Sequence, residues 1–140
     1  MCSSDLMAAQ REQKSVSLQD VEAFCRSAPG GPLRLVEGAG GVMSPLGEGF
    51  TNLDLIVALG AKPVLVAGTY LGTISHTLTA LEAMRVRGVV PAAVVLSQSA
   101  ASPVEPAETA ATLARFTTCP IMHVARGGEV PEALVDAIAA

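Results

Sequence analysis

The feature that most constrains the fold is an alternation of short apolar segments with segments of helical periodicity along the 140-residue chain. The apolar segments predict strands at about 33–36, 62–67, 91–96 and 120–124. The helical segments lie at about 17–28, 53–59, 73–87, 105–116 and 131–139. Strands joined by helical crossovers form a parallel sheet with right-handed connections. The sequence therefore predicts an α/β fold, a parallel sheet with flanking helices.

Two of the predicted helices have ends with typical capping residues. Ser17 is expected to cap the helix at 17–28 and Asn52 the helix at 53–59, because their side-chain oxygens accept from free backbone N–H groups. Gly60 is expected to end the second helix. The buried face of the first helix is expected to carry Val21, Phe24 and Cys25.

Residues 1–14 are polar and carry no convincing periodicity. The opening Met1–Leu6 does not resemble the start of a folded domain. We therefore expect residues 1–14 to be a disordered or non-native leader. Residues 15–140 contain no linker and no internal repeat, so we expect them to belong to one domain.

Composition excludes several classes of partner. The net charge is −4, no run of Lys or Arg occurs, and aromatic residues make up 3% of the chain, which argues against nucleic acid and anionic membranes. No apolar stretch reaches the roughly 18 residues of a membrane span, and no secretory signal is present. The scattered cysteines, Cys2, Cys25 and Cys119, fit reduced thiols. We therefore expect a cytoplasmic protein.

A carboxylate and a glycine turn follow the first predicted strand. Glu37 stands at the strand exit, and Gly38, Ala39, Gly40 and Gly41 come after it. Parallel α/β sheets bind ligands at this end of their strands, and Mg²⁺ takes one or two protein carboxylates. The pattern is typical of a metal-bound phosphate site. It is equally typical of a solvated glutamate before a plain tight turn.

A second glycine-containing loop precedes the helix at 73–87. The helix start at Gly72–Ser75 offers free N–H groups and the positive end of the helix dipole, with the hydroxyls of Thr73 and Ser75 beside Ile74. This arrangement suits a carboxylate or a phosphate, although every helix has such an end. His76, in the first turn, is either a general base or a packing or surface residue.

The last two strands also end in polar residues. Ser97 and Gln98 follow the third strand and suit a contact with a nucleotide base, or they start a polar loop. Ala125 and Arg126 follow the fourth strand, where the arginine either meets a phosphate or is solvated.

Taken together, these motifs resemble dethiobiotin synthetase over about Val16–Ala140. The resemblance implies a P-loop NTPase-like three-layer sandwich and an ATP-dependent carboxylase and cyclase. Such enzymes convert 7,8-diaminopelargonic acid and CO₂ with Mg-ATP to dethiobiotin, in biotin biosynthesis, and act as homodimers. The residues that carry the resemblance are Val36–Gly41 with Pro45 and Leu46, Lys62–Val66, Leu71–Leu78 and Leu81–Ala83.

The resemblance also implies roles for individual residues. Glu37 would be a magnesium ligand, and Gly38, Ala39 and Gly40 would run beside the nucleotide phosphates and the bound carbamate. Gly41 and the helix start at Gly72, Thr73, Ile74 and Ser75 would hold the substrate, reaching across a homodimer interface. Ser97, Gln98, Ala125 and Arg126 would contact the nucleotide.

The chain departs from the family pattern in several places. The family begins with a GxxxxGK[ST] phosphate-binding loop and a carbamate lysine, and these 140 residues contain no such segment. Ser75 and Ser97 stand where many members carry Asn. The chain thus resembles the C-terminal portion of the enzyme, without its N-terminal strands or catalytic residues, and we expect a truncated, inactive fragment. The alternatives are a fragment of a corrinoid amidoligase and a non-catalytic α/β dimerisation or binding module.

Overall fold

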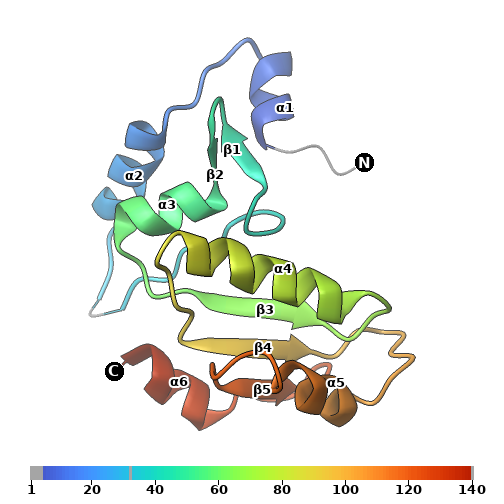
Figure 1. The fold of residues 1–140 in the computed structure, drawn as a ribbon. Coiled ribbons are helices and arrows are strands. Elements are labelled where there is room, and N and C mark those ends of the chain that lie inside the picture. The colour runs from blue at the N-terminus through green and yellow to red at the C-terminus, as the bar shows by residue number, and fades with distance from the viewer. Residues whose placement is uncertain (1–4, 32, 140) are drawn as a thin grey trace. The chain divides into compact units, whose positions relative to one another are not determined.

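The computed structural model describes residues 5–31 and 33–139 and divides into two compact units, Met1–Ala61 and Lys62–Ala140 (Figure 1). The N-terminal unit contains α1 (Asp5–Arg11), α2 (Leu18–Ser27), β1 (Pro45–Gly47), β2 (Phe50–Thr51) and α3 (Asn52–Leu59). The C-terminal unit contains β3 (Val64–Gly68), α4 (Thr73–Val86), β4 (Ala93–Ser97), α5 (Pro106–Leu113), β5 (Ile121–Val124) and α6 (Glu132–Ala139). The single domain expected for residues 15–140 stays a prediction.

A three-stranded parallel sheet forms the centre of the C-terminal unit (Figure 1). The strand order is β3-β4-β5, and β4 pairs with both neighbours along its length. Ala93, Val94 and Leu96 of β4 are fully buried, as expected for a central strand covered on both faces. The prediction of a parallel α/β sheet is confirmed, and the fold is consistent with a P-loop NTPase-like α/β class.

Helices cover both faces of this sheet, so the unit has three layers. On one face, α4 and α5 pack through Ile74, Leu78 and Leu113 against Ala67 and Leu96 of the strands. On the other face, α6 packs against the sheet in a cluster that includes Val64, Val95, Leu134 and Ile138. These apolar contacts, rather than helix propensity, stabilise the short helices.

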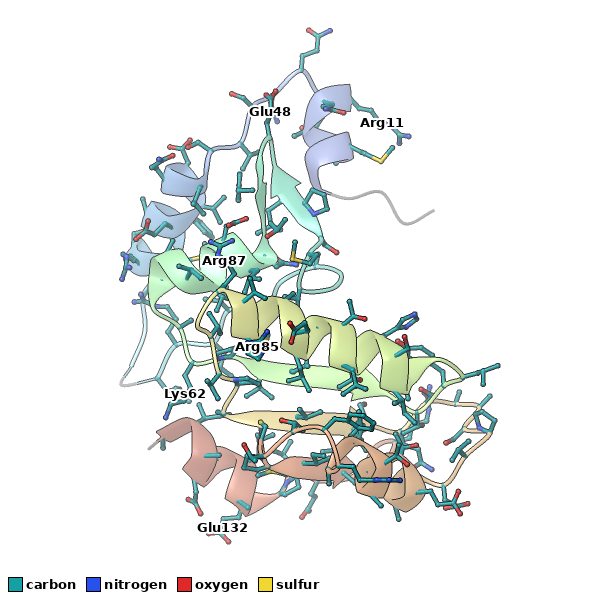
Figure 2. All side chains as sticks on the ribbon, viewed as in Figure 1. Arg11, Glu48, Lys62, Arg85, Arg87 and Glu132 are labelled. Atoms are coloured by element: carbon teal, nitrogen blue, oxygen red, sulfur yellow. The ribbon has the colours of Figure 1, made fainter. Side chains whose placement is uncertain are left out.

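The exposed surface of α4 carries an ion pair between side chains one turn apart. Arg85, labelled in Figure 2, donates to the carboxylate of Glu82 at 2.7 and 2.6 Å. The hydrogen bond from the guanidinium holds the pKa of Glu82 below its ordinary value. Because both side chains are solvated, the pair contributes little to stability.

In the N-terminal unit, two helices and a short hairpin share a core. Cys25, Leu46, Phe50 and Leu55 are buried together. Strands β1 and β2 pair antiparallel. Ser17 caps α2, as predicted, by accepting from the N–H of Asp20 at 3.1 Å.

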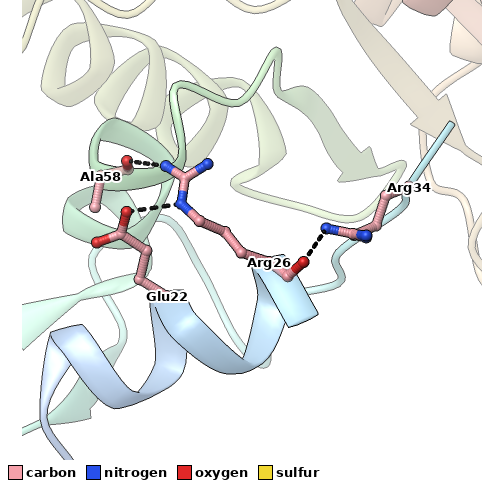
Figure 3. A network of polar contacts seen from close by, with 4 residues as sticks. All are labelled: Glu22, Arg26, Arg34 and Ala58. Atoms are coloured by element: carbon pink, nitrogen blue, oxygen red, sulfur yellow. Dashed lines mark hydrogen bonds and ion pairs between the residues drawn. The ribbon is translucent and has the colours of Figure 1, made fainter. Parts of the chain in front are cut away.

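Arginine side chains tie α2 to its neighbours (Figure 3). Arg26 pairs with Glu22 one turn earlier and donates to the carbonyl of Ala58 on α3, both at 2.9 Å. Arg34 donates to the carbonyl of Arg26 at 3.0 Å and to that of Ala28 at 2.6 Å. The last carbonyls of α2 therefore find donors outside the helix.

The strand expected at 33–36 is absent, and that prediction is wrong. The segment is irregular, and Leu33, Leu35 and Val36 are 52%, 76% and 47% exposed. A strand is stabilised by ladder hydrogen bonds to a neighbour, and this segment pairs with none of the strands in the described part of the chain. An apolar run shows only that a segment suits a sheet, not that a neighbouring strand is available.

Three smaller expectations also differ from the structure. Phe24 is 74% exposed because α2 packs through Leu18, Val21 and Cys25, one residue to the side of the expected face. Asn52 is the first residue of α3, and Thr51 is its N-cap. Part of the expected leader is helical, since α1 consists largely of strong helix formers.

Candidate functional site

The carboxyl edge of the parallel sheet brings together four of the predicted nucleotide contacts. Ser97 is in register with Val124, and the N–H of Gln98 donates to the carbonyl of Val124 at 3.0 Å. The N–H of Arg126 donates in turn to Oε1 of Gln98 at 3.1 Å. Ser97, Ala125 and Arg126 are exposed at this edge. The amide nitrogen of the Gln98 side chain therefore remains a donor at this edge, where Ser97 and Arg126 are exposed.

Side chains lock the adjoining loop after β3 to the loop after β4. The N–H of Thr69 donates to Oγ of Ser99, and the N–H of Ser99 donates to Oγ1 of Thr69, each at 3.0 Å. Gly68 lies so close to this pair that an added Cβ would stand 2.9 Å from the Ser99 hydroxyl and 2.7 Å from the Tyr70 ring. The edge is thus built from backbone held in fixed positions.

The N-terminus of α4 lies in the same unit and has no side-chain cap. Gly72 is the N-cap residue, with φ of 95°, and the first bond within the helix runs from the N–H of His76 to the carbonyl of Gly72. The N–H of Thr73 donates to Tyr70, but the N–H groups of Ile74 and Ser75 have no acceptor among the described residues. Two free donors at the positive end of a helix dipole suit an anion.

The structure gives Thr73 a structural role. Its side chain is buried, and its hydroxyl donates to the carbonyl of Gly68 at 2.6 Å. Ser75 is exposed, so its hydroxyl remains available. His76 is exposed and shares a hydrogen bond of 3.1 Å between its Nδ1 and the Tyr70 hydroxyl. That contact orients the imidazole beside the helix start.

Glu37 and the glycine turn belong to the N-terminal unit. Glu37 through Gly41 are all exposed. Within the described part of the chain, the Glu37 carboxylate has no hydrogen-bond or ion-pair partner. Gly40 has φ of 79° and the N–H of Gly41 donates to Oγ of Ser44 at 2.8 Å, so the turn has a defined path.

Sequence reasoning missed a residue that makes two hydrogen bonds to this turn. Asn52 is 7% exposed, and its Nδ2 donates to the carbonyls of Ala39 and Gly41, both at 2.9 Å. The sequence pointed to Asn52 only as a helix cap. No local pattern relates it to a turn eleven to thirteen residues earlier.

The fit of a metal ion rests on Glu37 alone. The described residues contain no group of three or more His, Cys, Asp or Glu side chains able to hold a metal. A single exposed carboxylate still fits Mg²⁺, because this ion keeps several waters and takes further oxygens from substrate phosphates. It does not fit a dedicated protein cage for zinc or calcium.

A separate groove in the C-terminal unit lies at the amino ends of β4 and β5, away from the carboxyl edge. Its lining is largely apolar and includes Leu78, Leu81, Val90 and Phe116. The lining residue Cys119 donates its S–H to the carbonyl of Pro91 at 3.2 Å. None of the predicted site residues lines this groove.

Comparisons with known proteins match these features to one family. The family model described as an AAA domain covers residues 1–133. An ATP-dependent dethiobiotin synthetase BioD of Caulobacter sp. (strain K31) is 52% identical over 126 residues, which are 88% of this chain and 54% of that protein. The protein of the same name from Methylobacterium nodulans is 40% identical over 138 residues, 96% of this chain and 61% of the relative.

A third relative with this name, from Phenylobacterium zucineum, is 52% identical over 113 residues, 77% of this chain and 48% of the relative. The chain therefore spans roughly half of the length of the relatives it matches. The resemblance drawn from the sequence motifs is confirmed. Among the described residues, no helix is both long and apolar enough to cross a membrane.

Proposed function

Since the chain belongs to the AAA domain family, we propose that it acts in an ATP-dependent dethiobiotin synthetase, the activity for which its relatives are named. The proposed reaction closes the ureido ring of dethiobiotin from 7,8-diaminopelargonic acid and CO₂, in the cytoplasm. The observation that carries the proposal is the uncapped start of α4, with two free N–H donors, beside a rigid carboxyl edge. The three relatives described above favour this activity over a corrinoid amidoligase.

The start of α4 would hold the substrate carboxylate. The N–H groups of Ile74 and Ser75 supply two donors, and the exposed hydroxyl of Ser75 supplies a third. Gly72 leaves the approach open because it has no side chain, and its positive φ favours glycine. We place this contact across a homodimer interface, where Gly41 would also meet the substrate.

The loop of residues 37–40 would bind the nucleotide phosphates. Glu37 would hold Mg²⁺, which when bound supplies positive charge to the phosphate oxygens. The backbone of Gly38, Ala39 and Gly40 would run beside the phosphates and the carbamate, where the small residues permit close approach. Because Glu37 has no protein partner in the described residues, no ion pair has to break when it takes a ligand.

Nucleotide recognition would lie at the ends of β4 and β5. Oε1 of Gln98 already accepts from the backbone of Arg126, and this contact aims the Gln98 side-chain amide. That amide and the Ser97 hydroxyl would contact the base, with Ala125 beside them. The exposed Arg126 guanidinium would contact a phosphate.

A charge change at Ser75 tests the substrate contact. Ser75→Asp places a carboxylate at the third residue of α4, where it favours the helix dipole but repels a bound carboxylate. We expect the affinity for 7,8-diaminopelargonic acid, measured by calorimetry, to fall about tenfold or more, and the Tm to stay or rise. Ser75→Asn is the neutral control of nearly the same size. Equal affinity for the Asp and Asn variants would exclude the start of α4 as the carboxylate site.

Incubating the unaltered chain with its proposed substrate, Mg-ATP and bicarbonate tests whether it forms dethiobiotin. These 140 residues contain no GxxxxGK[ST] segment, so we propose that they bind substrate without forming dethiobiotin on their own. Dethiobiotin produced by the 140-residue chain would contradict this. Binding without turnover is also what a non-catalytic binding module would give, and restored turnover with an added P-loop segment would distinguish the two.

A further inference from the structure

Asn52 is held in one orientation by two backbone carbonyls. Both hydrogens of its side-chain amide are used, one toward Ala39 and one toward Gly41, at 2.9 Å each. Because only the nitrogen can donate, these contacts fix which end of the amide faces the turn. The oxygen Oδ1 must therefore point the other way.

That oxygen is buried against Gly38. Oδ1 of Asn52 has no hydrogen-bond partner among the described residues and almost no exposed surface. A Cβ added to Gly38 would stand 2.5 Å from Oδ1 and 2.8 Å from Cγ of Asn52. A buried acceptor without a donor is costly, and so it calls for an explanation. Here the unpartnered oxygen belongs to the same amide that donates two hydrogen bonds to the turn.

The rest of the turn is attached to the same end of α3. The N–H of Asn52 donates to the carbonyl of Ser44 at 3.1 Å, and the N–H of Leu53 donates to that of Val42 at 2.9 Å. The first N–H groups of α3 are thus occupied by the loop and do not form an anion site. Leu53 is 1% exposed, so the start of α3 is anchored in the protein interior.

We propose that Asn52 is a positioning residue that fixes the backbone of residues 38–41 and, through it, the direction of the Glu37 carboxylate. Gly38 and Asn52 form a matched pair, since the amide occupies the space that any side chain at position 38 would need. The glycine at 38 is therefore required by a contact inside the protein as well as by any ligand. The link to metal and phosphate rests on the proposed function, whereas the positioning is a property of the free chain.

A double-mutant cycle tests the matched pair. Gly38→Ala is expected to lower the Tm of the Asn52 protein, and to lower it less in an Asn52→Ala background, where the Cβ finds space. Gly41→Ala is the matched control, because a Cβ there meets nothing within 4 Å. Whatever change it makes to the Tm should be of the same sign and size in both backgrounds, because its Cβ does not contact Asn52. Equal effects of Gly38→Ala in the two backgrounds would overturn the pairing.

Amide resonances separate positioning from a purely structural role. We expect Asn52→Ala to shift or broaden the ¹H–¹⁵N signals of residues 37–41, while Val57→Ala, on the exposed side of α3, leaves them in place. Unchanged signals in Asn52→Ala would overturn the proposal even if the Tm falls. If this variant does not fold, Asn52→Ser, which is too short to reach both carbonyls, replaces it in both experiments.

Paramagnetic Mn²⁺ then reports on the proposed function. In the unaltered chain it should broaden the signals around Glu37, and the Mn²⁺ concentration required should rise severalfold in Asn52→Ala. No broadening in the unaltered chain would count against Glu37 as a metal ligand. The Tm cycle and the metal-free signals would still decide the role of Asn52, so the two failures are distinguishable.

Discussion

At the scale of single residues, the glycines of the candidate site loops have different reasons to be glycine. Gly40 adopts a positive φ and lies against the Ser44 side chain, and Gly68 lies against Tyr70 and Ser99. Gly41 has open space around it and no positive φ. A glycine-rich run therefore combines positions required by the backbone with positions that leave room for a ligand. Sequence alone gives all of them the same letter.

Cys119 provides a residue-scale prediction with a defined pH dependence. Burial raises the pKa of its thiol above the ordinary value, and a backbone hydrogen bond opposes this only in part. Because the thiolate is the nucleophile, we expect iodoacetamide to modify Cys119 more slowly than free cysteine near pH 8.5, which is about the ordinary thiol pKa. Mass spectrometry of the Cys119 peptide across pH gives the rate. The prediction would be contradicted if the modification rate of Cys119 reached half of its maximum at or below the pH at which free cysteine does.

The same shift has a consequence for stability. The folded chain holds the Cys119 proton more tightly than the unfolded chain does. The thiol's contribution to stability is therefore complete below the unfolded pKa and is lost as the pH rises through the folded value. Cys119→Ser should remove this part of the fall in Tm at alkaline pH.

At the scale of elements, α2 and α3 begin with side-chain caps, whereas α4 and α5 do not. Ser17 caps α2, and Thr51 and Asp54 form a reciprocal capping box at the start of α3. In contrast, α4 begins at Gly72 with no side-chain cap. An uncapped N-terminus beside the carboxyl edge of a parallel sheet is where free donors are of use to a ligand.

Removing the cap of α3 should weaken the N-terminal unit. Thr51→Ala eliminates the hydroxyl that lies 3.4 Å from the N–H of Asp54 and donates to its carboxylate at 2.8 Å. We expect the free energy of unfolding, from a denaturant titration, to fall by about 1 kcal/mol. Ser17→Ala should cost a similar amount at α2. If Ser17→Ala lowers the free energy of unfolding as expected and Thr51→Ala does not, the capping box contributes nothing to stability.

At the scale of the whole molecule, each of the two units has a hydrophobic core of its own. Cys25, Phe50 and Leu55 belong to the cluster of the N-terminal unit, and β4 runs through the centre of the C-terminal unit. The apolar segment 33–36 belongs to no sheet among the described residues. Stability is therefore expected to differ strongly along the chain.

Hydrogen exchange should show this difference directly. The amides of Val94, Val95 and Leu96 lie in the central strand and are expected to exchange most slowly. Those of residues 33–36 have no ladder bonds and should exchange within the first time points. Protection at 33–36 comparable to that of β4 would mean that the segment pairs as a strand in solution, as the sequence pattern first indicated.

The sequence by itself determined what depends on neighbours along the chain. Three of the four expected strands and all of the expected helices are present, and Ser17 and Gly60 end their helices as expected. The polar residues at the ends of β4 and β5 were also identified, because parallel strands bring their carboxyl ends to one edge. Helix periodicity and capping involve residues only a few positions apart, so the local sequence is enough to predict them.

Only the tertiary structure decided what depends on partners distant in sequence. In the described part of the chain, segment 33–36 has no neighbouring strand and Phe24 is exposed. The side-chain amide of Asn52 donates to the carbonyls of Ala39 and Gly41 instead of capping its own helix. Each outcome depends on whether a second surface or a backbone carbonyl stands at the right place. A residue's propensity does not specify its contacts, because burial and long-range hydrogen bonds are properties of pairs.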